Sequence, residues 1–135
     1  MHKSDNLSLD KKEHAYAFLM AGCDPSKPDT FMGYVYNILV AAYILSLSGS
    51  TSDIVVMVRI AVGSHETKLP PDVEKYFHDS NILVKYLPKP IVDNFYSATM
   101  DKFEILDLVQ YSRVLFLDSD IMPFCNLDYL FHLSD

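Results

Sequence analysis

Short apolar runs alternate along the chain with longer segments of helical character. Four runs of five or six residues are mostly apolar, with Lys85 and Arg113 as their only charged members: Ala15–Met20, Ile54–Val58, Ile82–Leu87 and Arg113–Leu117. A half-buried strand would instead alternate apolar and polar side chains. Continuous apolar runs therefore predict strands that are covered on both faces, as in a parallel sheet.

The segment Phe31–Leu47 is the longest apolar stretch, at 17 residues. It is shorter than the roughly 20 apolar residues that a membrane span needs, and polar residues interrupt it. We therefore expect a helix that is buried within an α/β layer. Asp29 or Thr30 is the predicted N-cap, and Gly49 is placed to end the helix in a left-handed conformation.

Further helical patterns separate the remaining strands. Pro70-Pro71 opens a short helix that ends near Phe77, and Leu127–Leu133 forms a terminal turn. Ser97–Gln110 is a further helix, in which Phe103, Leu106 and Val109 recur every three residues along one apolar face. The order β-α-β-α-β-α-β predicts an α/β, Rossmann-like, mostly parallel sheet with helices on both faces. We expect one domain over residues 15–135, preceded by a disordered polar leader at 1–14.

Composition narrows the range of partners. The 135 residues carry a net charge of −7, with 18 acidic against 11 basic side chains, so nucleic acid is an unsuitable partner. Two cysteines make no disulfide framework. The N-terminus lacks the apolar core of a signal peptide, which slightly favours the cytoplasm and leaves the Golgi open.

The most informative positions follow the fourth apolar run. Asp118, Ser119 and Asp120 stand directly after Arg113–Leu117, at the strand end where ligands bind in open α/β sheets. In an extended chain, residues i and i+2 share a face, so the two carboxylates would point the same way. Paired carboxylates suit Mn²⁺ or Mg²⁺, with phosphate and water completing the shell. The plainer interpretation is a turn that ends a strand.

The surrounding residues resemble a known family. DKFEILDLVQYSRVLFLDSDIMPFCNLDYLF and YVYNILVAAYILSLSGSTSDIVVMV are similar to glycosyltransferase family 8, the glycogenin-like group, over about 110 residues. The resemblance implies a GT-A fold. It also implies metal-dependent transfer of a hexosyl group from a UDP-sugar to an acceptor, with retention of configuration and Mn²⁺ preferred.

The resemblance also implies roles for individual residues. Asp118 and Asp120 would bind the metal, and Asp118 and Ser119 would meet the ribose. Lys102 would reach the phosphates or the sugar. The remaining residues would form the base pocket: Leu19 and Ala21 through backbone groups, and Tyr34 by stacking near the uracil. Asn126 and Asp128 match the motif but are expected to shape the turn after the site.

In this fold the first and fourth strands are neighbours, which places a crevice between Ala21-Gly22 and the two aspartates. The family's third metal ligand and its catalytic residue would lie beyond Asp135, so we expect the chain to bind UDP and to transfer sugar poorly.

Two other interpretations of the function stay open. One is a haloacid-dehalogenase-like phosphatase with Asp118 as its nucleophile. The other is a UDP-sugar-binding module without turnover. The acceptor is unknown, and a homodimer is left open.

Overall fold

Four parallel strands form the sheet in the computed structural model, which describes residues 13–88, 108, 110–123 and 125–133. The strands are β1 (His14–Cys23), β2 (Asp53–Ile60), β3 (Ile82–Tyr86) and β4 (Arg113–Phe116). Their order in the sheet is β3-β2-β1-β4, and every neighbouring pair is parallel. This confirms the predicted α/β, Rossmann-like class and places the first strand beside the fourth.

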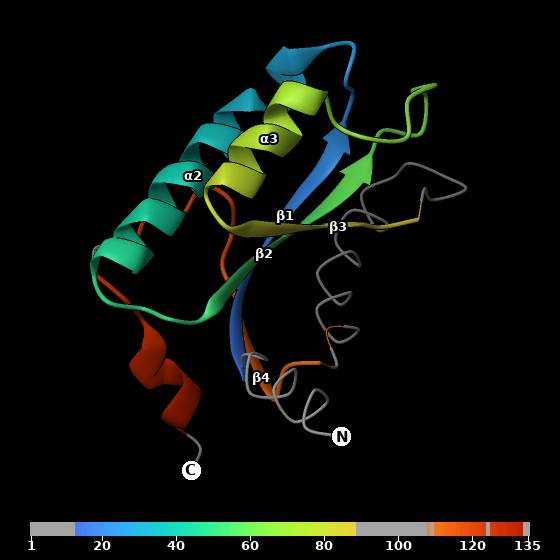
Figure 1. Ribbon diagram of the computed structural model, residues 1–135. Coiled ribbons are helices and arrows are strands. Elements are labelled where there is room, and N and C mark those ends of the chain that lie inside the picture. Colours follow the sequence, from blue (N-terminus) through green and yellow to red (C-terminus); the bar gives the residue numbers. More distant parts are fainter. Residues whose placement is uncertain (1–12, 89–107, 109, 124, 134–135) are drawn as a thin grey trace, which may run out of the picture.

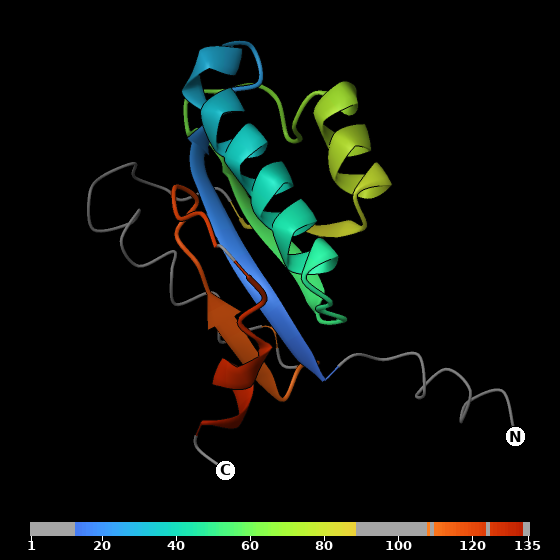
Figure 2. The ribbon, with the colours of Figure 1, turned by 90° about the vertical axis from the view of Figure 1, so that its left-hand side faces the viewer.

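Two α-helices cover one face of the sheet. They are α2 (Met32–Leu47) and α3 (Pro71–Asp79), and they lie side by side in Figure 1. In Figure 2, α2 lies in front of the strands and α3 stands to its right. Short 3-10 segments precede α2 and end the described chain: η1 (Pro28–Thr30) and η3 (Asp128–His132). None of the helices that the structure describes is long and apolar enough to cross a membrane.

Alternate residues of the central strands face two separate hydrophobic clusters. Tyr16, Phe18 and Met20 of β1 pack beneath the two helices, together with alternate residues of β2. Ala15 and Ala17 face the opposite side. There they meet Val55, Met57, Leu87, Leu108 and Tyr111. Burial on both faces explains why these strands read as unbroken apolar runs.

Most of the predicted boundaries are confirmed, but the start of α2 differs. Its N-cap is Phe31, which makes no side-chain cap. The Thr30 hydroxyl instead bonds to the Lys27 carbonyl and accepts from the Asp24 N–H, because η1 intervenes before the helix begins. The end of α2 follows the prediction: Gly49 has a φ of 94°, and the Ser50 N–H donates to the Leu45 carbonyl.

The burial of α2 also differs from the prediction. Val35, Ile38, Ala41, Ala42 and Leu45 face the core, whereas the opposite side of the helix is exposed. Beyond the described residues lie the expected leader up to residue 12, Lys102 and nearly all of the expected helix at 97–110.

Candidate functional site

The candidate site lies at the ends of β1 and β4, where the strands that neighbour β1 lie on its two opposite sides. From β1 the connections lead to β2 on one side, and β4 pairs with β1 on the other, so a crevice forms at the ends of these two strands. Figure 2 shows β4 (orange) beside the long β1 (blue). The pairing continues past β4, since the Leu117 N–H donates to the Ala17 carbonyl at 2.9 Å and the Ser119 hydroxyl donates to the Leu19 carbonyl.

The chain turns immediately after this contact. The Ile121 N–H donates to the Asp118 carbonyl at 3.0 Å, which closes a turn over Asp118–Ile121. Ser119 is buried, with 9% of its surface exposed, whereas Asp118 and Asp120 are exposed. The expectation that an extended chain aligns the two carboxylates is therefore wrong, because Asp120 already belongs to the turn.

Both carboxylates nevertheless line one pocket of about 320 Å³. Its walls are Leu19, Met20, Ala21, Tyr34, Phe116, Asp118, Ser119 and Asp120. The volume lies within the range of small-molecule sites. The structure thus brings together six of the seven residues expected at the site. The seventh, Lys102, lies outside the described residues. Sequence reasoning missed Met20 and Phe116, which stand beside predicted positions in strands that were read only as core.

The end of β1 is bent where it borders the pocket. Gly22 has a φ of 68°, and the register with β2 shifts between Met20 and Cys23. The Ala61 N–H then pairs with the Cys23 carbonyl at 2.8 Å. A Cβ on Gly22 would meet nothing within 4 Å, so the backbone angle, and not a lack of space, calls for glycine here.

The charge of the pocket limits what it can hold. Among the described residues that line it, two carry negative charge and none carries positive charge. A diphosphate would be repelled from this surface unless a cation lay between them. No group of three His, Cys, Asp or Glu side chains that could hold a metal occurs in the described part of the chain. Two carboxylates fit a cation that takes its other ligands from phosphate and water.

The segment that follows the turn is fastened to the opposite end of β1. The Asp128 carboxylate accepts from the hydroxyls of Tyr16 and, at 2.9 Å, of Ser50. The Leu127 N–H donates back to the Tyr16 hydroxyl at 2.9 Å, and the Asn126 side chain donates to the Ser48 carbonyl at 2.8 Å. These bonds agree with the expectation that Asn126 and Asp128 shape the chain after the site.

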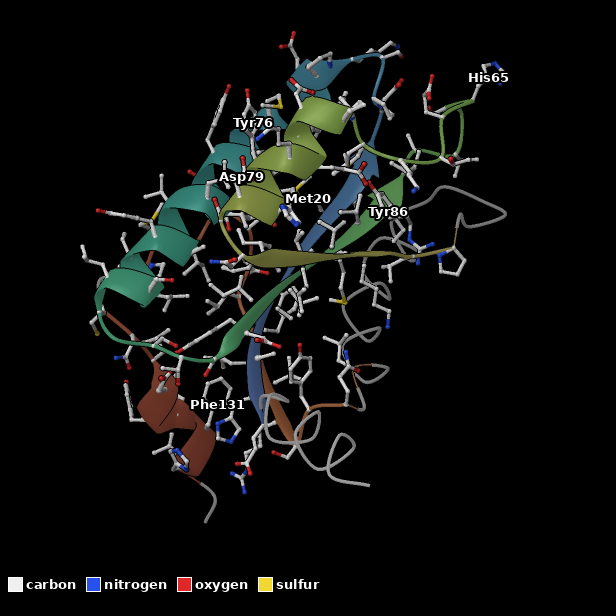
Figure 3. The ribbon with its side chains drawn as sticks, viewed as in Figure 1. Met20, His65, Tyr76, Asp79, Tyr86 and Phe131 are labelled. Atoms are coloured by element: carbon white, nitrogen blue, oxygen red, sulfur yellow. The ribbon has the colours of Figure 1, made fainter. Side chains whose placement is uncertain are left out.

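Tyr16 was not foreseen as the anchor of this segment, although a tyrosine within a buried apolar run must find a partner for its hydroxyl. Next to it, Phe131 of η3 stacks on His14 with ring centres 4.6 Å apart, as its place beside the start of β1 in Figure 3 illustrates. The Arg113 guanidinium donates to the Phe131 carbonyl at 2.7 Å. The loop that carries Asp118 and Asp120 is thus held at both of its ends.

Comparison with known proteins points to plant enzymes. No protein-family model matches the chain. Galactinol synthase 3 of Arabidopsis thaliana is 29% identical over 70% of this chain. UDP-glucuronate:xylan alpha-glucuronosyltransferase 1 of the same plant is 28% identical over 76%. Another Arabidopsis protein, whose name provisionally assigns the same glucuronosyltransferase activity, is 24% identical over 98%.

The chain spans only part of each relative, from 15% to 34% of their lengths. These similarities favour the transferase interpretation of the chain over the phosphatase one. Together, the sequence similarity and the parallel α/β fold make the chain similar to the glycosyltransferases of family 8.

Proposed function

We propose that the chain is the nucleotide-sugar-binding part of a metal-dependent, retaining glycosyltransferase that transfers a hexosyl group from a UDP-sugar to an acceptor. One observation carries the proposal: Asp118 and Asp120 line the same pocket as Tyr34 and the end of β1. The pocket therefore offers carboxylates that can hold a cation and an aromatic ring on which a base can stack. A site for a nucleoside diphosphate requires both.

Asp118 and Asp120 would hold the divalent cation, with Mn²⁺ preferred and Mg²⁺ as the alternative. When bound, such a cation neutralises the negative charge that develops on a departing diphosphate. Both side chains are exposed, so a hydrated ion can reach them from solvent and keep some of its waters as ligands.

The other pocket residues would bind the nucleoside. Tyr34 is 45% exposed, so its ring offers a free surface on which a uracil can stack. The Ser119 hydroxyl already donates its proton to the Leu19 carbonyl. It can therefore only accept a hydrogen bond from a ribose hydroxyl, and this sets the orientation of the sugar. Leu19 and Ala21 would frame the base, and Lys102 would reach the phosphates.

The names of the relatives support the donor class. Two of them name UDP-glucuronate as a substrate of those proteins, and a UDP-sugar donor for this chain follows by similarity. Because the chain spans 15% to 34% of their lengths, we expect it to bind the donor and to transfer sugar poorly by itself.

Titration calorimetry tests the proposal. We expect UDP to bind in the presence of Mn²⁺ and to lose most of its affinity in EDTA. We also expect UMP to bind more weakly than UDP, because it lacks the phosphate that a shared cation would bridge. UDP affinity that is indifferent to EDTA, or absent in both conditions, would contradict it.

A further inference from the structure

The outer side of α2 carries an apolar stripe that the described part of the chain leaves exposed. Tyr36, Val40, Tyr43 and Leu47 are 58%, 47%, 65% and 73% exposed. At 3.6 residues per turn, these four positions fall within an arc of about 60°. We call them the α2 stripe. A stripe this narrow and continuous differs from the scattered apolar residues of an ordinary surface.

The spacing of the stripe is that of a helix-pairing seam. Its members follow at intervals of four, three and four residues, which is the a/d pattern by which one helix packs against another. None of the 16 residues of α2 is charged, so no side chain of the helix would be buried as an ion in such a contact. By contrast, the core side of α2 already carries its own set of buried residues.

We propose that the α2 stripe is a two-fold interface between two copies of this chain, with the two α2 helices antiparallel. In that arrangement Tyr36 lies opposite the partner's Leu47, and Val40 lies opposite the partner's Tyr43. Each tyrosine then faces a smaller aliphatic side chain, so the stripe is complementary to itself, as an isologous contact demands. A parallel pair would set tyrosine against tyrosine and leave a gap at Val40.

The area of the α2 stripe and the charge of the chain favour a second copy of the chain, and not a membrane surface, as the partner that covers the stripe. Covering the stripe in both copies removes on the order of 1,000 Å² from water, which is where specific interfaces begin. A helix that binds membranes carries lysine or arginine on its polar side, and α2 has neither. The net charge of −7 also opposes binding to anionic lipid. This proposal is independent of the proposed function.

Analytical ultracentrifugation over a concentration series tests the interface with two matched variants. Tyr43→Lys places a charge in the centre of the stripe, and Ser46→Lys places the same charge on an exposed position of α2 outside it. We expect a dimer for the natural sequence and for Ser46→Lys. Tyr43→Lys should raise the dissociation constant by about 100-fold, because a two-fold contact loses the residue twice.

Raising the salt concentration should strengthen the dimer, since two bodies of charge −7 repel each other less when they are screened. A natural chain that stays monomeric, or a dimer that Tyr43→Lys leaves intact, would overturn the proposal.

Cross-linking tests the direction of the helices. In a Cys125→Ser background, which removes the exposed native thiol, Tyr36→Cys and Leu47→Cys proteins should form disulfide-linked dimers only when mixed. Dimers within either single-cysteine protein alone would overturn the antiparallel arrangement.

Discussion

The hydroxyl of Tyr16, in the first strand, donates a hydrogen bond to the carboxylate of Asp128, which lies 112 positions later in the chain. The contact joins the centre of the sheet to the segment that returns from the candidate site. Because the Leu127 N–H also bonds to the same hydroxyl, one side chain fixes two groups of that segment. The position of the Asp118–Asp120 loop therefore depends on a residue far from the pocket.

Replacing Tyr16 by phenylalanine should lower the free energy of unfolding by about 1–3 kcal/mol, because Asp128 and the Leu127 N–H would lose a partner in a partly buried place. Urea denaturation followed by circular dichroism measures this change. Tyr129→Phe is the matched control, since Tyr129 is 60% exposed, and it should leave the stability unchanged. Equal stabilities of the two variants would show that the Tyr16 bond contributes nothing.

The order of the elements was predictable because strands that are buried on both faces appear in the sequence as continuous apolar runs. All four strands were placed to within a few residues, as β1 illustrates: it was expected at Ala15–Met20 and spans His14–Cys23. The cap of α2 was mispredicted because the polar residues Asp29 and Thr30 fall in a 3-10 turn just before the helix. Helix propensities of single residues do not distinguish this 3-10 turn from the first turn of the α-helix.

The residues that line the pocket were largely predictable from the sequence, but the backbone geometry that brings them together was not. The alternation argument put Asp118 and Asp120 on one face of a strand, whereas a turn closed by the Ile121 N–H brings them together. The exposed side of α2 was also missed. A helix that is apolar all round reads as fully buried, and only the packing of the neighbouring elements decides which side stays open.

Alkaline pH should destabilise the fold through its buried tyrosines. Burial, and then a hydrogen bond to a carboxylate, raises the pKa of Tyr16, Tyr86 and Tyr111 well above the ordinary value of 10.0. The partners are Asp128, Glu74 and Asp53. Below pH 10 both folded and unfolded states hold these protons, so the stabilisation is complete. Above it the unfolded state ionises first, and stability falls as pH rises towards the folded pKa.

Ultraviolet titration of tyrosine ionisation measures this effect. We expect at least these three of the nine tyrosines to ionise only together with unfolding, whereas all nine should ionise near pH 10 in urea. A native titration curve that superimposes on the curve in urea would contradict the expectation.

Gly22 and Gly33 offer a matched pair of alanine substitutions. Both have open space where a Cβ would stand, but Gly22 has a φ of 68° and Gly33 lies in α2. Gly22→Ala should cost about 1–2 kcal/mol, because the left-handed region disfavours a side chain. Gly33→Ala should leave stability unchanged or raise it. Thermal unfolding measures both, and the idea fails if the two variants shift the midpoint equally.

Tyr34 should contribute to binding through its ring. Tyr34→Ala should weaken Mn²⁺-dependent UDP binding by about tenfold, the lower range for loss of one aromatic stacking partner. Tyr34→Phe keeps the ring and should bind nearly as well as the natural chain. Fluorescence competition can compare UDP with pyrophosphate, which has no base and should bind all three proteins alike. Weakened pyrophosphate binding in Tyr34→Ala would mean that the ring supports the pocket instead of stacking on the base.

The paired carboxylates are tested most directly by Mn²⁺ paramagnetic resonance, which follows the signal of the free ion as UDP is added. With the natural chain we expect UDP to draw Mn²⁺ into a protein-bound complex beyond what UDP binds in solution. Asp118→Asn and Asp120→Asn should each abolish that excess, because each removes one of the two exposed carboxylates that would hold the ion. Asp72→Asn changes an exposed carboxylate outside the pocket and should keep the excess. If Asp120→Asn retained the full excess, the account of this site would be wrong.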